Sequence, residues 1–177
     1  MSDLTIKHAG STVTQTRHEV LSNNKKLNQM KVDLIDVTVA TDADASGELL
    51  ITTTEIPNAV AVKGGTAILQ SVMFMSNKVL TDAIDIVITN DATTQGTIGA
   101  TVADSSVANT VMDGTCGFFS ITNLFDAGAV AIGSKNNIGM VCKAAADSTS
   151  LYLWAIAKGS TDWDVDTGVI RLGFIQD

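Results

Sequence analysis

The chain has two histidines, His8 and His18, which are the side chains best suited to act as a general base near neutral pH. Both lie in residues 1–31, a polar stretch whose apolar residues follow no sustained period. Nucleophilic catalysis pairs a serine or cysteine with such a base and holds both on rigid elements. A polar arm supplies no such frame, so we predict that neither histidine is catalytic and that the chain is not an enzyme.

A pair of carboxylates is the other route to catalysis, because glycoside hydrolysis needs two of them about 5–10 Å apart. The chain has 19 Asp and Glu residues, so such pairs arise by chance, whereas aromatic residues make up only 5% of the chain and sugar clefts favour aromatic platforms. We expect Trp154 in the core and Trp163 at a rim. A carboxylate-dependent hydrolase is therefore the least favoured function.

One acidic segment begins like the calcium loop of an EF-hand, with Asp42, Asp44 and Glu48 around a glycine. The match then fails, since the twelfth position is Thr53 and the flanking segments are predicted strands. A similar spacing recurs at Asp162, Asp164 and Asp166. We interpret both segments as solvated acidic hairpins, keep calcium as a weak alternative at the first, and predict no cofactor.

Charge is unevenly distributed along the chain. The formal net charge is −8, but residues 1–31 carry five basic and two acidic residues, which leaves six basic and seventeen acidic residues in 32–177. A basic arm therefore precedes an acidic body. An acidic body argues against nucleic acid as a partner, because phosphate-binding domains present a basic face.

Hydrophobic patterning excludes a membrane span, because no stretch approaches about 18 consecutive apolar residues. Residues 1–31 also lack the apolar core of a secretory signal. Cys116 and Cys142 lie in apolar runs, where cysteines are usually small buried hydrophobes. We predict two unbridged, largely buried thiols.

Short apolar runs separated by Gly, Asn, Asp and Ser predict strands along the rest of the chain. The expected strands are 32–40, 48–54, 59–62, 67–75, 83–89, 117–122, 129–132, 138–143, 151–157 and 169–175. Helix is limited to a turn or two in 103–112 and one turn near 17–21. The predicted fold is all-β: an antiparallel, jelly-roll-like β-sandwich body at 32–177 behind an extended arm at 1–31.

Alternation within these strands predicts a core made of one residue in two. The expected core residues are Ile68, Val72, Ile84, Ile86, Ile88, Phe118, Ile121, Leu151, Leu153, Leu172 and Phe174.

Three segments of the body, 60–72, 83–88 and 150–159, and the closing run 168–177 resemble small proteins of tailed-phage head modules. Their strings are VAVKGGTAILQSV, AIDIVI, SLYLWAIAKG and GVIRLGFIQD. The resemblance implies a capsid decoration, or cement, protein that is made in the host cytoplasm and sits on the capsid surface of the virion. It further implies the major capsid protein as partner and a homo-oligomer, with a trimer favoured.

The basic arm is the predicted attachment element, because opposite charges steer docking on an acidic partner while buried apolar side chains supply affinity. Its expected contact residues are Arg17, Leu21, Lys25, Lys26, Leu27, Met30 and Lys31. The alternative function is a receptor- or glycan-binding β-sandwich of a phage head fibre or tail appendage. A free arm and an exposed groove near Trp163 would favour that alternative.

Overall fold

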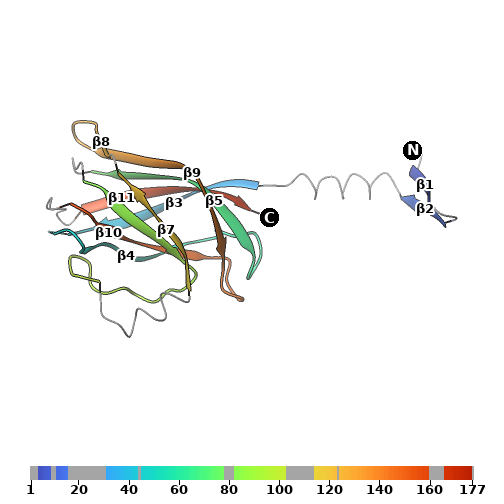
Figure 1. Cartoon of the computed structure of the whole chain (residues 1–177), viewed down its shortest axis with the longest axis horizontal. Coiled ribbons are helices and arrows are strands. Elements are labelled where there is room, and N and C mark those ends of the chain that lie inside the picture. The colour runs from blue at the N-terminus through green and yellow to red at the C-terminus, as the bar shows by residue number, and fades with distance from the viewer. Residues whose placement is uncertain are drawn as a thin grey trace. The chain divides into compact units, whose positions relative to one another are not determined.

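The computed structural model describes residues 4–8, 11–15, 31–43, 45–77, 82–102, 114–122, 124–159 and 166–176. The chain divides into two compact units, Met1–Met30 and Lys31–Asp177. In the first unit, β1 (Leu4–His8) and β2 (Ser11–Gln15) form an antiparallel hairpin in which Ile6 pairs with Val13 (Figure 1). The sequence analysis expected extended chain here; the β-branched residues of both segments account for the pairing.

The second unit, which we call the body, contains nine strands among its described residues. These are β3 (Lys31–Thr41), β4 (Leu49–Ile56), β5 (Thr66–Ser76), β6 (Ile84–Thr89), β7 (Thr115–Ile121), β8 (Leu124–Asp126), β9 (Ala131–Lys143), β10 (Leu151–Ala157) and β11 (Asp166–Gln176) (Figure 1). A four-stranded sheet has the order β4-β10-β6-β7, and a five-stranded sheet has the order β3-β11-β5-β9-β8. Every pairing within the two sheets is antiparallel.

The chain alternates between the two sheets in the manner of a jelly roll. The first strand of the body, β3, pairs with the last, β11, and the second, β4, pairs with β10. Apart from the short β8, each sheet therefore has four strands, which is the eight-stranded arrangement of two Greek keys. The all-β, jelly-roll-like sandwich predicted from the sequence is confirmed.

The core lies between the sheets and comes from alternate residues of each strand. Nine of the eleven predicted core residues are buried, including Ile84, Ile86 and Ile88 of β6. Two predictions were wrong. Ile68 is only half-buried, and Phe118 is 69% exposed. Because Phe118 pairs with the outward-facing Val87, its neighbour Phe119 is the one that enters the core.

Three element predictions also differ from the structure. Residues 59–62, expected as a strand, form a turn region after Asn58, whose positive φ of 55° bends the chain. The expected strands 129–132 and 138–143 are one long strand, β9, with an irregularity opposite Gln70. The three-residue β8 was not predicted. The helical turns expected near 17–21 and in 103–112 lie outside the described residues.

Candidate interaction surface

The outward side of the five-stranded sheet carries many apolar side chains. In each of its strands, alternate residues face the core and the remainder face outward. The outward apolar residues, which together we call the open face, are Val32, Leu34, Ile68, Met73, Met75, Phe125, Ile132, Val141, Val169 and Ile175. Apolar surface of this extent is a common mark of protein–protein contact.

Strand register collects part of the open face into one row at the end of the sheet where β3 begins. Ile175 pairs with Val32 on one side and with Ile68 on the other, and Ile68 pairs in turn with Val141. This terminal row crosses four strands. Val141 is 64% exposed, so its end of the row is open to solvent. The row begins one residue after Lys31, where the body joins the arm.

A second row crosses all five strands towards the other end of the sheet. Val169 pairs with Thr38 and Met75, Met75 pairs with Ile132, and Ile132 pairs with Phe125. We call these five residues the pocket row, because four of them, all except Phe125, line a hollow of about 310 Å³. The hollow is lined by Thr38, Met75, Ser76, Asn77, Val130, Ile132, Thr167, Gly168 and Val169. None of these lining residues is charged or aromatic, so the hollow suits an aliphatic side chain of a partner.

A polar strip separates the two rows. The Arg171 guanidinium donates from Nε to Asp36 Oδ1 at 2.7 Å and from its terminal nitrogen to Asp36 Oδ2 at 2.8 Å. This hydrogen-bonded pair lowers the pKa of Asp36. Both groups are solvent-exposed, so the ion pair adds little to the stability of the fold. Its two parallel hydrogen bonds nevertheless fix the orientation of the guanidinium relative to the carboxylate. A smaller hollow of about 210 Å³ lies beside Arg171 and Leu34.

The outward side of the four-stranded sheet is arranged differently, because the chain itself covers much of it. Leu49, Val87 and Trp154 are buried there, with Val102 and Ile156 packed against them. Residues 93–101 run beside β4, where the Leu49 amide donates to the Ala100 carbonyl at 2.8 Å. Trp154 is thus a core residue, as predicted.

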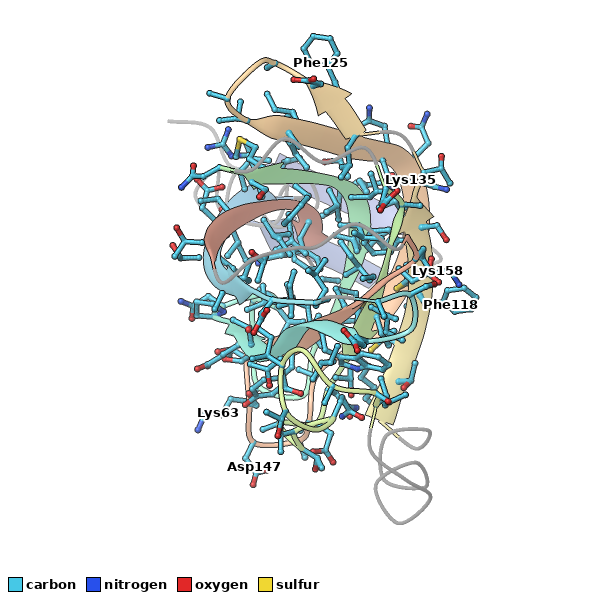
Figure 2. All side chains as sticks on the ribbon, turned by 90° about the vertical axis from the view of Figure 1, so that its left-hand side faces the viewer. Lys63, Phe118, Phe125, Lys135, Asp147 and Lys158 are labelled. Atoms are coloured by element: carbon cyan, nitrogen blue, oxygen red, sulfur yellow. The ribbon has the colours of Figure 1, made fainter. Side chains whose placement is uncertain are left out.

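Polar groups occupy the other half of that sheet's outer side. Lys158 Nζ lies 3.2 Å from Asp85 Oδ2, and the Ser120 hydroxyl donates to Asp85 Oδ1 at 2.6 Å. Phe118 is exposed beside this group. Figure 2 shows Phe118 and the open-face residue Phe125 both pointing away from the ribbon. Phe118 and Phe125 are therefore a matched pair: exposed phenylalanines on opposite sheets.

Most of the predicted attachment residues lie outside the described residues, namely Arg17, Leu21, Lys25, Lys26, Leu27 and Met30. Lys31 is the first residue of β3 and pairs with Gln176. His8 ends β1, whereas His18 and Trp163 lie outside the description. The arm's role therefore stays a prediction.

The weak calcium alternative also stays untested, because Asp44 lies outside the described residues. Glu48 Oε2 accepts a hydrogen bond from the Ala45 amide at 2.9 Å, which closes the turn within the loop. Within the described ranges, no group of three or more His, Cys, Asp or Glu residues is placed to hold a metal ion. No helix among those residues is long and apolar enough to cross a membrane.

Sequence reasoning missed the open face, although one signal pointed towards it. β5 carries apolar residues on both of its faces: Leu69, Val72 and Phe74 face the core, while Met73 and Met75 face outward. A strand with only one buried side normally alternates apolar with polar residues. The sequence thus shows that the outer side of β5 is apolar. The rows across strands can be recognised only when the pairing register between the strands is known.

No protein-family model matches the sequence, and no curated protein is significantly similar to it. Solved structures that are similar include a chain of the cyanophage Pam1 capsid asymmetric unit, with 13% identity and a TM-score of 0.33 over 83% of this chain and 86% of that one. A chain of Sacbrood virus of honeybee has 8% identity and a TM-score of 0.37 over 98% and 88%. A chain of desmodium yellow mottle tymovirus has 12% identity and a TM-score of 0.27 over 84% and 88%. TM-scores this low do not assign a function.

Proposed function

We propose that this chain is a viral structural protein: a decoration, or cement, protein that binds the outside of an assembled phage capsid and stabilises it by bridging capsid subunits. The observation that carries the proposal is the open face, which has two apolar rows separated by one fixed ion pair. In the second sheet, the chain itself covers part of the outer side and polar groups occupy the rest, so the open face is the broad apolar side left for a partner. The proposed partner is the major capsid protein.

The proposed mechanism is preferential binding to the assembled shell, in which no covalent bond is made or broken. A protein that binds the assembled shell in preference to free subunits stabilises the shell by about 2.7 kcal/mol per site when its concentration is a hundred times the dissociation constant. Many such sites on one particle add up. Stabilisation therefore needs only a surface that recognises the assembled arrangement.

The basic arm and the open face are proposed to act together on the same partner. The arm ends at Lys31, which is also the first residue of β3 and is followed directly by Val32 of the terminal row. The body carries a strong excess of acidic residues, so an acidic shell surface would repel it. The cations of the arm would be attracted to that surface and would steer the docking. We further propose that the protein acts as a homo-oligomer, with a trimer favoured.

The alternative, receptor or glycan binding, has less support from the described residues. Glycan sites favour an aromatic platform, and the lining of the larger hollow contains no aromatic residue.

The test compares charge substitutions on opposite sheets. In the full-length chain, Val141→Asp changes the terminal row, Phe125→Asp changes the pocket row, and Phe118→Asp is the control. Phe125 and Phe118 are 67% and 69% exposed, so all three variants should fold. We expect the two open-face variants to bind undecorated shells more than about tenfold more weakly, which corresponds to about 1.4 kcal/mol, because a carboxylate would have to be desolvated in the contact.

The control variant should bind within about twofold of wild type. A truncation that removes residues 1–30 leaves β3 whole and tests the arm separately across a salt series. Full-strength binding by both open-face variants, with loss only on truncation, would assign attachment to the arm alone. Undetectable binding of the folded wild-type chain to shells would reject the decoration function.

A further inference from the structure

Two thiols meet at a point where the sheets come together. Cys116 is on β7, an edge strand of the four-stranded sheet, and Cys142 is on β9 of the five-stranded sheet. Cys116 packs against the core cluster that contains Cys142, and the Cys142 thiol and the Lys143 backbone are close enough to lower the pKa of Cys116. Both cysteines are free. Two largely buried thiols were predicted: Cys142 is buried, whereas Cys116 is only half-buried.

The strand that carries Cys116 is irregular at that residue. The register of β7 against β6 shifts between Ile88 and Thr89, which leaves Cys116 outside the paired positions. Beside it, Gly117 allows β9 to approach, because a Cβ at Gly117 would lie 2.9 Å from Met140 Cε. Cys142 Sγ is 3.7 Å from the Met140 carbonyl oxygen. Met140 thus lies beside both cysteine positions, next to Gly117 on β7 and hydrogen-bonded through its carbonyl oxygen to the Cys142 thiol.

The two thiols differ in their readiness to react. The hydrogen bond from Cys142 and that from the Lys143 amide lower the pKa of Cys116 to about 7, against the opposing effect of burial. The same contact and burial raise the pKa of Cys142. Cys116 is half-buried, whereas Cys142 is fully buried. Because the thiolate is the nucleophile in disulfide exchange, Cys116 is the residue that reacts first.

We propose that Cys116 and Cys142 form a latent disulfide, which closes between the two sheets when the folded protein meets a small-molecule disulfide such as glutathione disulfide. This inference does not depend on the decoration function. It assigns a redox modification site to a pair of residues that plays no part in the open face.

The chemistry proceeds in two exchanges. The Cys116 thiolate attacks one sulfur of glutathione disulfide, so a mixed disulfide forms and one glutathione thiolate leaves. That thiolate takes up a proton as the Cys142 thiol loses its own, and the Cys142 sulfur then attacks the Cys116 sulfur and expels the second glutathione. The protein loses two electrons and two protons, and one glutathione disulfide becomes two glutathione molecules.

The test treats the folded full-length chain with glutathione disulfide and follows it by intact mass and by free-thiol labelling. We expect the wild type to become two hydrogens lighter and to lose both free thiols. Cys142→Ser should stop at a single glutathione adduct, because no second thiol can expel glutathione. Cys116→Ser should stay unmodified while folded, because Cys142 is buried.

Thermal melting supplies a second, independent readout. The bridge would close residues 116–142 into a covalent loop and tie the two sheets together, so the oxidised wild type should melt about 5–10 °C higher than the reduced form. A wild-type chain that remains a glutathione adduct, that links to a second chain, or that stays reduced under conditions that oxidise the denatured chain would overturn the proposal.

Discussion

The protonation of Cys116 can be measured directly by alkylation. Its pKa is lowered to about 7, first by the hydrogen bond from Cys142 and then by the Lys143 amide. Only the thiolate reacts, so the rate of carboxamidomethylation at Cys116 in reductant should rise with pH through a midpoint near 7. Peptide-level mass spectrometry at a series of pH values gives this midpoint.

Two variants of Cys142 separate hydrogen bonding from packing at Cys116. Cys142→Ser keeps a hydroxyl donor and should leave the midpoint near its wild-type value. Cys142→Ala removes the donor and should move the midpoint towards the ordinary cysteine value of about 8.5. An unchanged midpoint in the alanine variant would show that the contact with Cys142 does not set this pKa.

At the residue scale, alternation predicted which side chains are buried only where it was unambiguous. Ile84, Ile86 and Ile88 alternate cleanly with other residues, and all three are fully buried. Phe118 and Phe119 are adjacent, so only one of them can face the core, and period-two alternation with the predicted core residue Ile121 would have selected Phe119. The register of β7 against β6 makes that selection.

Among the described strands, β9 has an irregularity at a defined place. Its residues Asn136 and Met140 pair with Ser71 and Leu69, which leaves 137–139 as extra chain opposite Gln70. Asn137 and Gly139 have positive φ values of 56° and 66°, a region that favours glycine and asparagine. Cys142 lies in the half of β9 that follows this irregularity.

We expect Gly139→Ala to lower the free energy of unfolding by roughly 1–2 kcal/mol, because a Cβ disfavours the left-handed conformation. No atom lies within 4 Å of the Cβ position, so the loss would report backbone strain alone. Urea denaturation measures the change. Ser134→Ala, at an exposed position of the same strand, is the control and should stay within about 0.5 kcal/mol of wild type. A Gly139→Ala variant as stable as this control would contradict the interpretation.

At the element scale, strands with a sustained period of two were predictable, and short or irregular ones were not. The expected strand at 151–157 coincides with β10. By contrast, 59–62 reads as an apolar run, and Ala59 and Val60 are indeed buried, but they are buried in turn structure. Burial alone therefore does not define a strand. The open face was hidden for a related reason, since its rows exist only after five strands have been set in register.

For the whole molecule, the body holds its own core. The buried hydrophobic residues of the main cluster run from Val37 to Phe174, and all of them belong to Lys31–Asp177. We expect a chain that starts at Lys31 to melt cooperatively, with a midpoint within about 2 °C of the full-length protein, a shift that corresponds to less than about 1 kcal/mol for a domain of this size. Differential scanning calorimetry tests this, and a broad or much lower transition would show that residues 1–30 are part of the folding unit.

The direct junction of the arm with β3 also decides how the molecule responds to pulling. β3 is matched to β11 at eleven positions, from Lys31 with Gln176 to Thr41 with Asp166. Gly128 lies in the turn just before β9, at the end of the sheet opposite Lys31. Tension applied between the arm and this turn acts along β3, so all the pairs between β3 and β11 share the load and must break together. Tension between the arm and Gln176 starts at the neighbouring Lys31–Gln176 pair and opens the ladder one pair at a time. The same body is thus mechanically strong along one axis and weak along another.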